Sequence, residues 1–110
     1  MKNPLLTQRV TLYRLIGDRV QRILVESAFY SWQDCRTEEE DGIRFQRKCL
    51  LITPCEILPG DRVLEGVGPE IGLSEWTAFL PVTVPTLSEV EYVVPKYFLG
   101  KLYFYEGGRK

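Results

Sequence analysis

The sequence predicts an all-β protein: a small β-barrel or sandwich of six or seven strands with at most one short helical turn. Val, Ile, Leu, Tyr, Phe and Trp occur in short runs that end at Gly, Pro, Asp or Asn, as strands do. No window of a dozen residues carries the i, i+3, i+4, i+7 apolar stripe of an amphipathic helix. The chain has 110 residues, an ordinary length for one domain. We therefore expect residues 1–110 to form a single β-barrel-like domain.

The first two predicted strands are long and joined by a tight turn. Residues 9–16 are the first strand, and Gly17-Asp18 supplies the turn because glycine tolerates a positive φ. Residues 20–36 are the second, extended stretch. Its apolar alternation changes phase near Glu26-Ser27, which indicates a bend or a bulge.

A polar hairpin tip leads to the third strand. Residues 37–42 (TEEEDG) are expected to form a hydrophilic loop, and Asp41-Gly42 is a strong signal for a type I′ turn. Residues 43–53 are the returning strand. One of its faces is apolar apart from Arg47, and Cys49 in its apolar run is expected in the core.

Shorter elements follow in the second half of the chain. Residues 58–61 (LPGD) fit a type II turn, because proline fixes φ and the next glycine accepts a positive φ. Residues 62–64 are a short strand and residues 66–72 a glycine-rich loop. Within residues 73–84, Ser74 could begin a short helical turn, but two prolines prevent a longer helix.

The C-terminal segment is rich in aromatic residues. Residues 90–94 are a strand ended by Pro95, which argues for an edge position or a bulge. Residues 97–105 are expected to form two short strands that turn at Leu99-Gly100-Lys101. Residues 106–110 are expected to be a tail.

The composition argues against the common catalytic and metal-binding sites. The chain has no histidine, so Ser-His-Asp, Cys-His and zinc-hydroxide mechanisms are excluded in their usual forms. Its three cysteines contain no C-x-x-C pair. Gly66-Val67-Gly68 is followed by proline, which fails the test for a phosphate-binding loop. We expect no enzymatic activity, no cofactor, no metal ion and no small-molecule substrate.

Charge is balanced overall but unevenly distributed. The net charge is −1, which does not favour a general nucleic-acid binder. Residues 9–22 are basic, whereas residues 56–106 are mainly acidic. These segments are either solvated surface or complementary patches used by neighbouring copies. The candidate contacts of the second interpretation are Arg14, Arg19 and Arg22 of one copy with Glu89 and Glu91 of the next.

Other candidate protein contacts are aromatic or acidic. Side chains alternate along a strand, so Tyr103, Phe104 and Tyr105 cannot all face a core, and one face should present aromatic surface. That surface could instead stack bases in an OB-like nucleic-acid-binding module, although basic residues are sparse around it. The remaining candidates are Glu38, Glu39, Glu40, Asp41 and Trp76.

Several segments together resemble a known family. They are V-T-L-Y-R at residues 10–14, F-Y-S-W-Q at 29–33, L-L-I-T-P at 50–54 and I-L-P-G-D-R-V at 57–63. With the polar hairpin tip, they are similar to the small minor capsid or head-closure (stopper) proteins of tailed bacteriophages and prophages. The resemblance covers residues 7–66 and, more loosely, residues 91–105.

The resemblance implies an assembly protein. It implies rings of identical copies at the head–tail junction, contacts with portal, adaptor or tail proteins, and DNA only as passing cargo. The residue 37–41 tip is similar to the long hairpin loop that makes contacts between rings, and residues 66–75 are a second candidate. The expected location is the bacterial cytoplasm during assembly and then the virion, with no membrane contact: the N-terminus lacks a signal-peptide stretch, and no apolar run is long enough to span a bilayer. A tail-completion protein is a related alternative.

Overall fold

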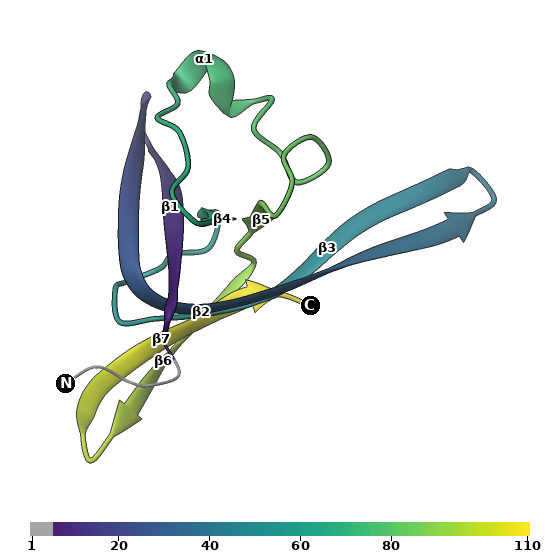
Figure 1. The fold of residues 1–110 in the computed structure, drawn as a ribbon. Coiled ribbons are helices and arrows are strands. Elements are labelled where there is room, and N and C mark those ends of the chain that lie inside the picture. Colours follow the sequence, from purple (N-terminus) through teal and green to yellow (C-terminus); the bar gives the residue numbers. More distant parts are fainter. Residues whose placement is uncertain (1–5) are drawn as a thin grey trace.

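The computed structural model describes residues 6–110 and consists mainly of β-strands (Figure 1). The elements in chain order are β1 (Gln8–Ile16), β2 (Arg19–Glu39), β3 (Gly42–Thr53), β4 (Arg62–Glu65), α1 (Leu73–Trp76), β5 (Ser88–Glu89), β6 (Tyr92–Phe98) and β7 (Lys101–Arg109). The all-β prediction with one short helical turn is confirmed. Within the described residues, no helix has the length and apolar character that crossing a membrane requires.

The seven strands form one antiparallel sheet in the order β5-β4-β1-β2-β3-β7-β6. The 21-residue strand β2 joins the two halves of this sheet, because its first part pairs with β1 and its second part with β3. In Figure 1, β2 bends sharply between these two parts. The bend folds the sheet over itself, so that one strand contributes to two walls around a common interior.

A β-bulge lies at this bend, as the change of alternation predicts. Val10 of β1 pairs with Val25. Two residues away in β1, Gln8 pairs with Ala28 instead of Ser27. Strand β2 therefore contains one extra residue near Glu26-Ser27, and such an insertion bends a strand and increases its twist.

The two walls enclose one main apolar core, which draws on both halves of the sheet. Its buried members are Val10, Leu12, Val25, Ala28, Tyr30, Cys49, Leu51, Ile57, Val63 and Val90. On the side where β5 and β6 end the sheet, the chain itself crosses between the walls. The Val90 N–H donates to the Asp61 carbonyl at 2.7 Å, and the Glu91 N–H donates to the Gly108 carbonyl at 2.7 Å. The body is thus barrel-like, although the sheet is not closed by a ladder between its end strands.

The connection from β4 to β5, residues 66–87, folds back over the outer face of β1; we call it the strap. Tyr13 of β1 packs edge-on against Phe79 of the strap, with ring centroids 4.7 Å apart. Its hydroxyl donates to the Pro69 carbonyl at 2.7 Å. Because the strap covers one face of β1 and the core covers the other, Val10, Thr11, Leu12 and Tyr13 are all fully buried.

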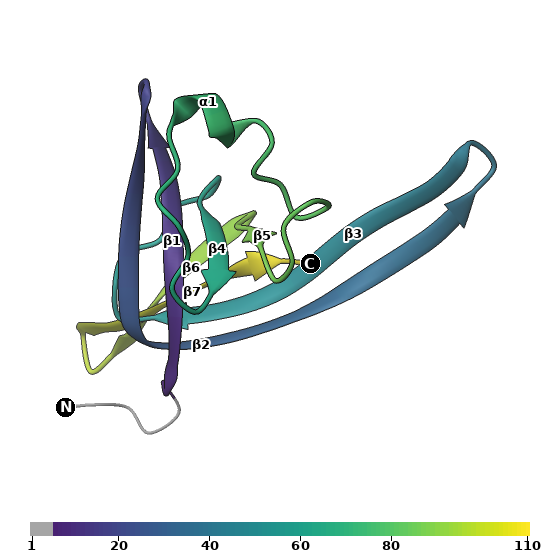
Figure 2. The same cartoon turned by 45° about the horizontal axis from the view of Figure 1, so that its top comes forward.

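Two hairpins extend beyond this body. Strands β2 and β3 pair with each other over residues 33–48, where no third strand joins them within the described chain; we call this hairpin the acidic arm. The end of the β6–β7 hairpin, residues 95–105, is the aromatic arm. The two arms project to opposite sides of the body (Figures 1 and 2). They explain why the radius of gyration is 14.7 Å, compared with about 13 Å for a compact chain of this length.

Several predicted boundaries need correction. Strand β2 continues to Glu39, so Glu38 and Glu39 belong to a strand and only Glu40-Asp41 forms the turn. Helix α1 begins after Gly72 as its N-cap, without a side-chain cap from Ser74. Residues 106–110 are not a tail, because β7 continues to Arg109.

The prediction for Pro95 is half right. Strand β6 passes through Pro95 to Phe98 instead of ending there. However, β6 is an end strand of the sheet, which is the position predicted for a strand that contains proline. Its register with β7 also shifts between Lys96 and Tyr97. The turn that follows, Leu99-Gly100, lies where it is predicted, with positive φ at both residues.

Candidate functional site

Arg14 is bound inside the chain. Its guanidinium donates two parallel hydrogen bonds to the carboxylate of Asp61, from Nε to Oδ1 at 2.9 Å and from Nη2 to Oδ2 at 2.8 Å. Asp61 is only 2% exposed and accepts a third hydrogen bond from the Leu58 N–H. The hydrogen bond to Asp61 raises the pKa of Arg14. We therefore correct the expectation that Arg14 is a free surface charge available to a neighbouring copy.

Arg22 is also used internally. Both Nε and Nη2 donate to the carbonyl of Gly68, at 2.9 and 2.6 Å. This fastens the glycine-rich start of the strap to β2. Arg19, at the exposed end of the β1–β2 hairpin, stays a predicted contact.

Trp76 and Arg62 form one unit beneath the strap. The guanidinium carbon of Arg62 lies 3.7 Å from the centroid of the Trp76 ring, a cation–π distance. Its Nη1 donates to the carbonyls of Trp76 and Phe79 at 2.6 and 2.8 Å. Burial lowers the pKa of Arg62. Trp76 is therefore half-buried and anchors the strap. This corrects the prediction that its side chain is available for contact with another protein.

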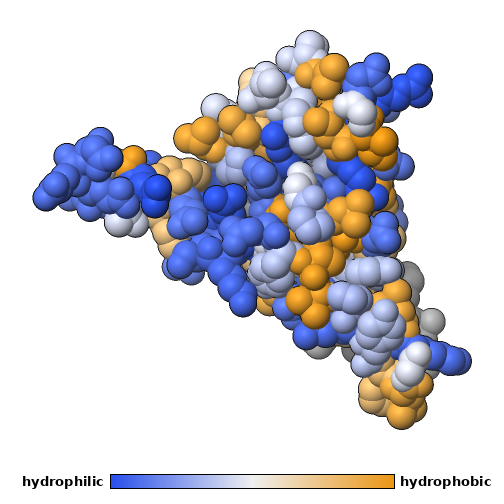
Figure 3. Space-filling model, turned by 180° about the vertical axis from the view of Figure 1, so that it is seen from behind, coloured by the Kyte–Doolittle hydropathy of each residue, from blue (hydrophilic) through white to orange (hydrophobic). Residues whose placement is uncertain are grey.

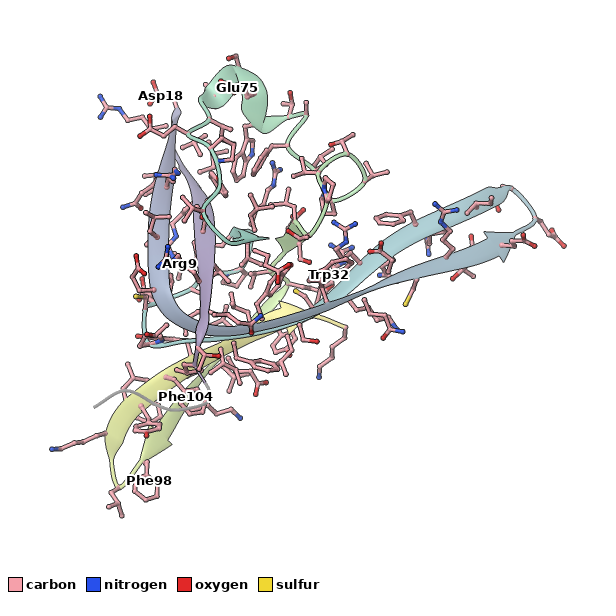
Figure 4. All side chains as sticks on the ribbon, in the orientation of Figure 1. Arg9, Asp18, Trp32, Glu75, Phe98 and Phe104 are labelled. Carbon is pink, nitrogen blue, oxygen red and sulfur yellow. The ribbon has the colours of Figure 1, made fainter. Side chains whose placement is uncertain are left out.

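Arg47 ties the strap to the acidic arm. Its Nε donates to Asp34 Oδ1 at 2.6 Å, and its Nη1 donates to the carbonyls of Val84 and Leu87 at 3.0 and 2.8 Å. The hydrogen bond from Arg47 lowers the pKa of the Asp34 carboxyl. Trp32 flanks the same guanidinium at the base of the arm, where Figure 4 labels it. The base of the acidic arm is therefore fixed to the body.

The predicted acidic partners lie close to arginines of their own chain. Glu91 lies 3.9 Å from Arg109, and both side chains are partly exposed. Glu89 is half-buried in β5, where it pairs with Arg62 of β4 across the sheet. Of the predicted contacts in residues 9–22 and 56–106, Arg14 and Arg22 are thus bonded within one molecule, and Glu89 and Glu91 lie beside arginines of the same chain. Arg19 and Glu91 are the members that stay exposed.

The tip of the acidic arm is exposed to solvent. Glu38, Glu39, Glu40 and Asp41 are all exposed. Glu39 lies 3.7 Å from Arg44, but both side chains are exposed, and a pair of this kind contributes about 0–1 kcal/mol. Among the residues that the structure describes, no group of acidic or thiol side chains is arranged to hold a metal ion.

The aromatic arm carries a group of exposed apolar side chains, including Leu99, the most exposed large apolar residue of the described chain. They are Tyr97 at 66%, Phe98 at 67%, Leu99 at 87%, Leu102 at 44% and Tyr103 at 57% exposure. Phe98 lies at the end of the hairpin in Figure 4, and Figure 3 shows the apolar tip and the hydrophilic acidic arm at opposite ends of the molecule. The predicted outward aromatic face is confirmed by Tyr103. Tyr105, which was also predicted to make a protein contact, is partly buried and packs against the main core.

A shallow groove of about 490 Å³ runs along the aromatic arm, lined by Lys96, Tyr97, Phe98, Tyr103 and Phe104. A smaller hollow of about 220 Å³ lies between β3 and the strap and includes Phe45, Arg47 and Pro81. Neither groove brings together two carboxylates or a nucleophile with a base.

The three free cysteines differ in accessibility and give a direct test of the fold. Cys55 is exposed, Cys35 is half-buried and Cys49 is buried. Burial also raises the pKa of the Cys49 thiol, so less of the reactive thiolate forms there. We expect a thiol reagent such as DTNB at pH 8 to label Cys55 first, Cys35 more slowly and Cys49 only when the protein is unfolded by denaturant. Cys55→Ser should remove only the fastest phase, and equal rates for all three thiols in the native protein would contradict this core.

Comparison of the chain with protein-family models, curated proteins and solved structures found no match.

Proposed function

We propose that this chain is a structural virion-assembly protein at the head–tail junction of a tailed phage, a head-closure or connector adaptor that works through protein–protein contacts in a ring. The observation that carries the proposal is the pair of projecting arms. A fixed body holds an apolar arm and an acidic arm on opposite sides, and a contact between two different surfaces is what builds a ring. The resemblance of residues 7–66 to head-closure proteins supports the same role.

The acidic arm also suits a location beside passing DNA. Residues 33–48 contain five acidic and four basic residues, and the excess of carboxylates lies at the tip, in residues 38–41. These exposed carboxylates would repel the phosphate backbone, so that a duplex could move through a ring without adhering to it. In this role, partners are the neighbouring copies and the portal, adaptor or tail proteins. Binding would need no cofactor.

One observation favours a second candidate, an OB-like nucleic-acid-binding module. Tyr97, Phe98 and Tyr103 are exposed beside Lys96 and Lys101, and aromatic side chains with nearby cations can stack single-stranded bases. A gel-shift assay with single-stranded DNA separates the two candidates. Tight binding that weakens steeply as salt is raised would favour the module over the assembly protein.

The assembly role is tested by deleting the gene from the phage or prophage genome that encodes it. We expect DNA-filled heads without tails, DNA leaking from them, and normal free tails, with infectivity restored by the gene on a plasmid. Heads that are complete beside unfinished tails would point to the tail-completion alternative. Normal particles from the deletion strain would contradict both assembly roles.

A further inference from the structure

The tip of the aromatic arm exposes large apolar side chains to solvent. Leu99 at the turn is 87% exposed, and Phe98 beside it is 67% exposed. Residues 95–105 also contain two lysines, Lys96 and Lys101, and no acidic residue. Exposed apolar groups that are rimmed by charge mark a contact surface. A partner for this tip should therefore offer apolar surface surrounded by negative charge.

The acidic arm has this character. Its tip carries Glu38, Glu39, Glu40 and Asp41, opposed locally by Arg44. Among these charges, Ile43 is 68% exposed and pairs directly across the hairpin with Glu38. The tip thus combines an apolar side chain with surplus carboxylates, complementary to the apolar side chains and lysines of the aromatic arm.

The two complementary tips cannot meet within one molecule. The arms lie on opposite sides of the body, and the longest extent of the molecule is 49 Å (Figures 1 and 2). Both are held at their bases, the acidic arm by the hydrogen bonds from Arg47 to the carbonyls of Val84 and Leu87 in the strap, and the aromatic arm by the pairing of β7 with β3. Two complementary surfaces on opposite sides of one molecule can bind each other only between two copies. Repeating such a contact from copy to copy generates a ring or a filament.

We propose that the aromatic arm of one copy docks on the acidic arm of the next copy, with Phe98 and Leu99 against Ile43 and the two lysines beside the carboxylates. This inference deepens the proposed assembly function and rests on it for its biological setting. It also replaces the pairing of Arg14 and Arg22 with Glu89 and Glu91 as the contact between copies.

The test is a charge exchange between the two arms. Self-association of the chain is measured by sedimentation at low salt, at protein concentrations up to about 1 mM, a range that detects weak contacts. Variant A is K96E/K101E, which has two acidic arms. Variant B is E38K/E40K, in which both arms are basic. We expect the wild-type chain to self-associate, and each variant alone to associate at least about tenfold more weakly because like charges then meet.

An equimolar mixture of A and B should associate again, because each altered arm then finds an opposite charge on the other variant. These side chains are exposed, so folding is checked by circular dichroism and is expected to be unchanged. Leu99→Ser should weaken association of the wild-type chain, whereas Val82→Ser, a matched change at an exposed residue of the strap, should not.

A chain that stays monomeric over the whole range overturns the inference, including one that binds anionic phosphatidylserine vesicles or single-stranded DNA as a monomer. Failure of the mixture to associate, or equal effects of Leu99→Ser and Val82→Ser, overturns it as well. These results are separable from the gene deletion. If the deletion strain makes tailless heads but the charge exchange fails, the assembly function is supported and this contact is contradicted. If the charge exchange succeeds but the deletion strain makes normal particles, the contact is supported and the assembly function is contradicted.

Discussion

Replacing Gly108 with alanine is expected to lower the free energy of unfolding by about 3 kcal/mol or more, at the upper end of what overpacking costs. Gly108 is buried in β7, where it pairs with Leu50 of β3 on one side and Tyr92 of β6 on the other. A Cβ added there would overlap the carbonyl oxygen of Cys49. That oxygen is part of the backbone, so it cannot move aside as the end of a flexible side chain can.

The expected loss is large relative to the stability of a small protein, which is about 5–15 kcal/mol in total. Urea denaturation followed by circular dichroism measures it. Gly72→Ala is the matched control, because Gly72 has a negative φ and its added Cβ would come no closer than 3.7 Å to the Glu75 carboxylate. Because Gly72 is the N-cap of α1 and alanine caps less well than glycine, the control should cost about 0.5–1 kcal/mol, well below the effect at Gly108. Equal stabilities for the two variants would mean that β7 is not packed between β3 and β6 at this point.

The same glycine shows where sequence reasoning stops. The Gly107-Gly108 pair reads as the start of a tail, because two residues without side chains give no apolar pattern. Their role follows from the close approach of β3, which lies more than fifty residues earlier in the chain. Signals for turns are local, and most were sufficient: Gly17, Gly60 and Gly100 have the positive φ that their turns require. The type I′ turn predicted at Asp41-Gly42 is wrong, because the turn residues are Glu40-Asp41, Asp41 has no positive φ, and Gly42 is the first residue of β3. The bulge in β2 was also predictable, since it depends only on the phase of one strand.

The candidate site was harder to predict than the fold for the same reason. Whether an arginine is free depends on what the fold brings beside it, and the partners of Arg14 and Arg22 are more than forty residues away. One signal was present in the sequence: Arg47 interrupts an otherwise apolar strand face, and a charge in such a position needs a buried partner. The exposed aromatic face was predictable because three successive aromatic residues on one strand cannot all point inward.

The second large effect is expected at Asp61. Replacing Asp61 with alanine should lower the free energy of unfolding by about 3 kcal/mol, because removing one member of a buried ion pair leaves the other without compensation. Asp61 is 2% exposed, and the side chain of Arg14 is 15% exposed. The change also removes the acceptor of the Leu58 N–H at the turn that precedes β4. Denaturant unfolding measures the loss.

Glu26→Ala is the matched control, since Glu26 pairs with Arg9 at 3.0 Å but both side chains are more than half exposed. It should cost less than about 1 kcal/mol, and its effect should fade at high salt, whereas the effect of Asp61→Ala should persist because buried pairs are screened less. The double variant R14M/D61A should be less destabilised than the sum of its single changes, because the two side chains interact directly. Additive effects would show that Arg14 does not depend on Asp61. Arg14 would then be free to bind a carboxylate of a neighbouring copy, and the contact between copies would have to be sought on β1 as well as on the two arms.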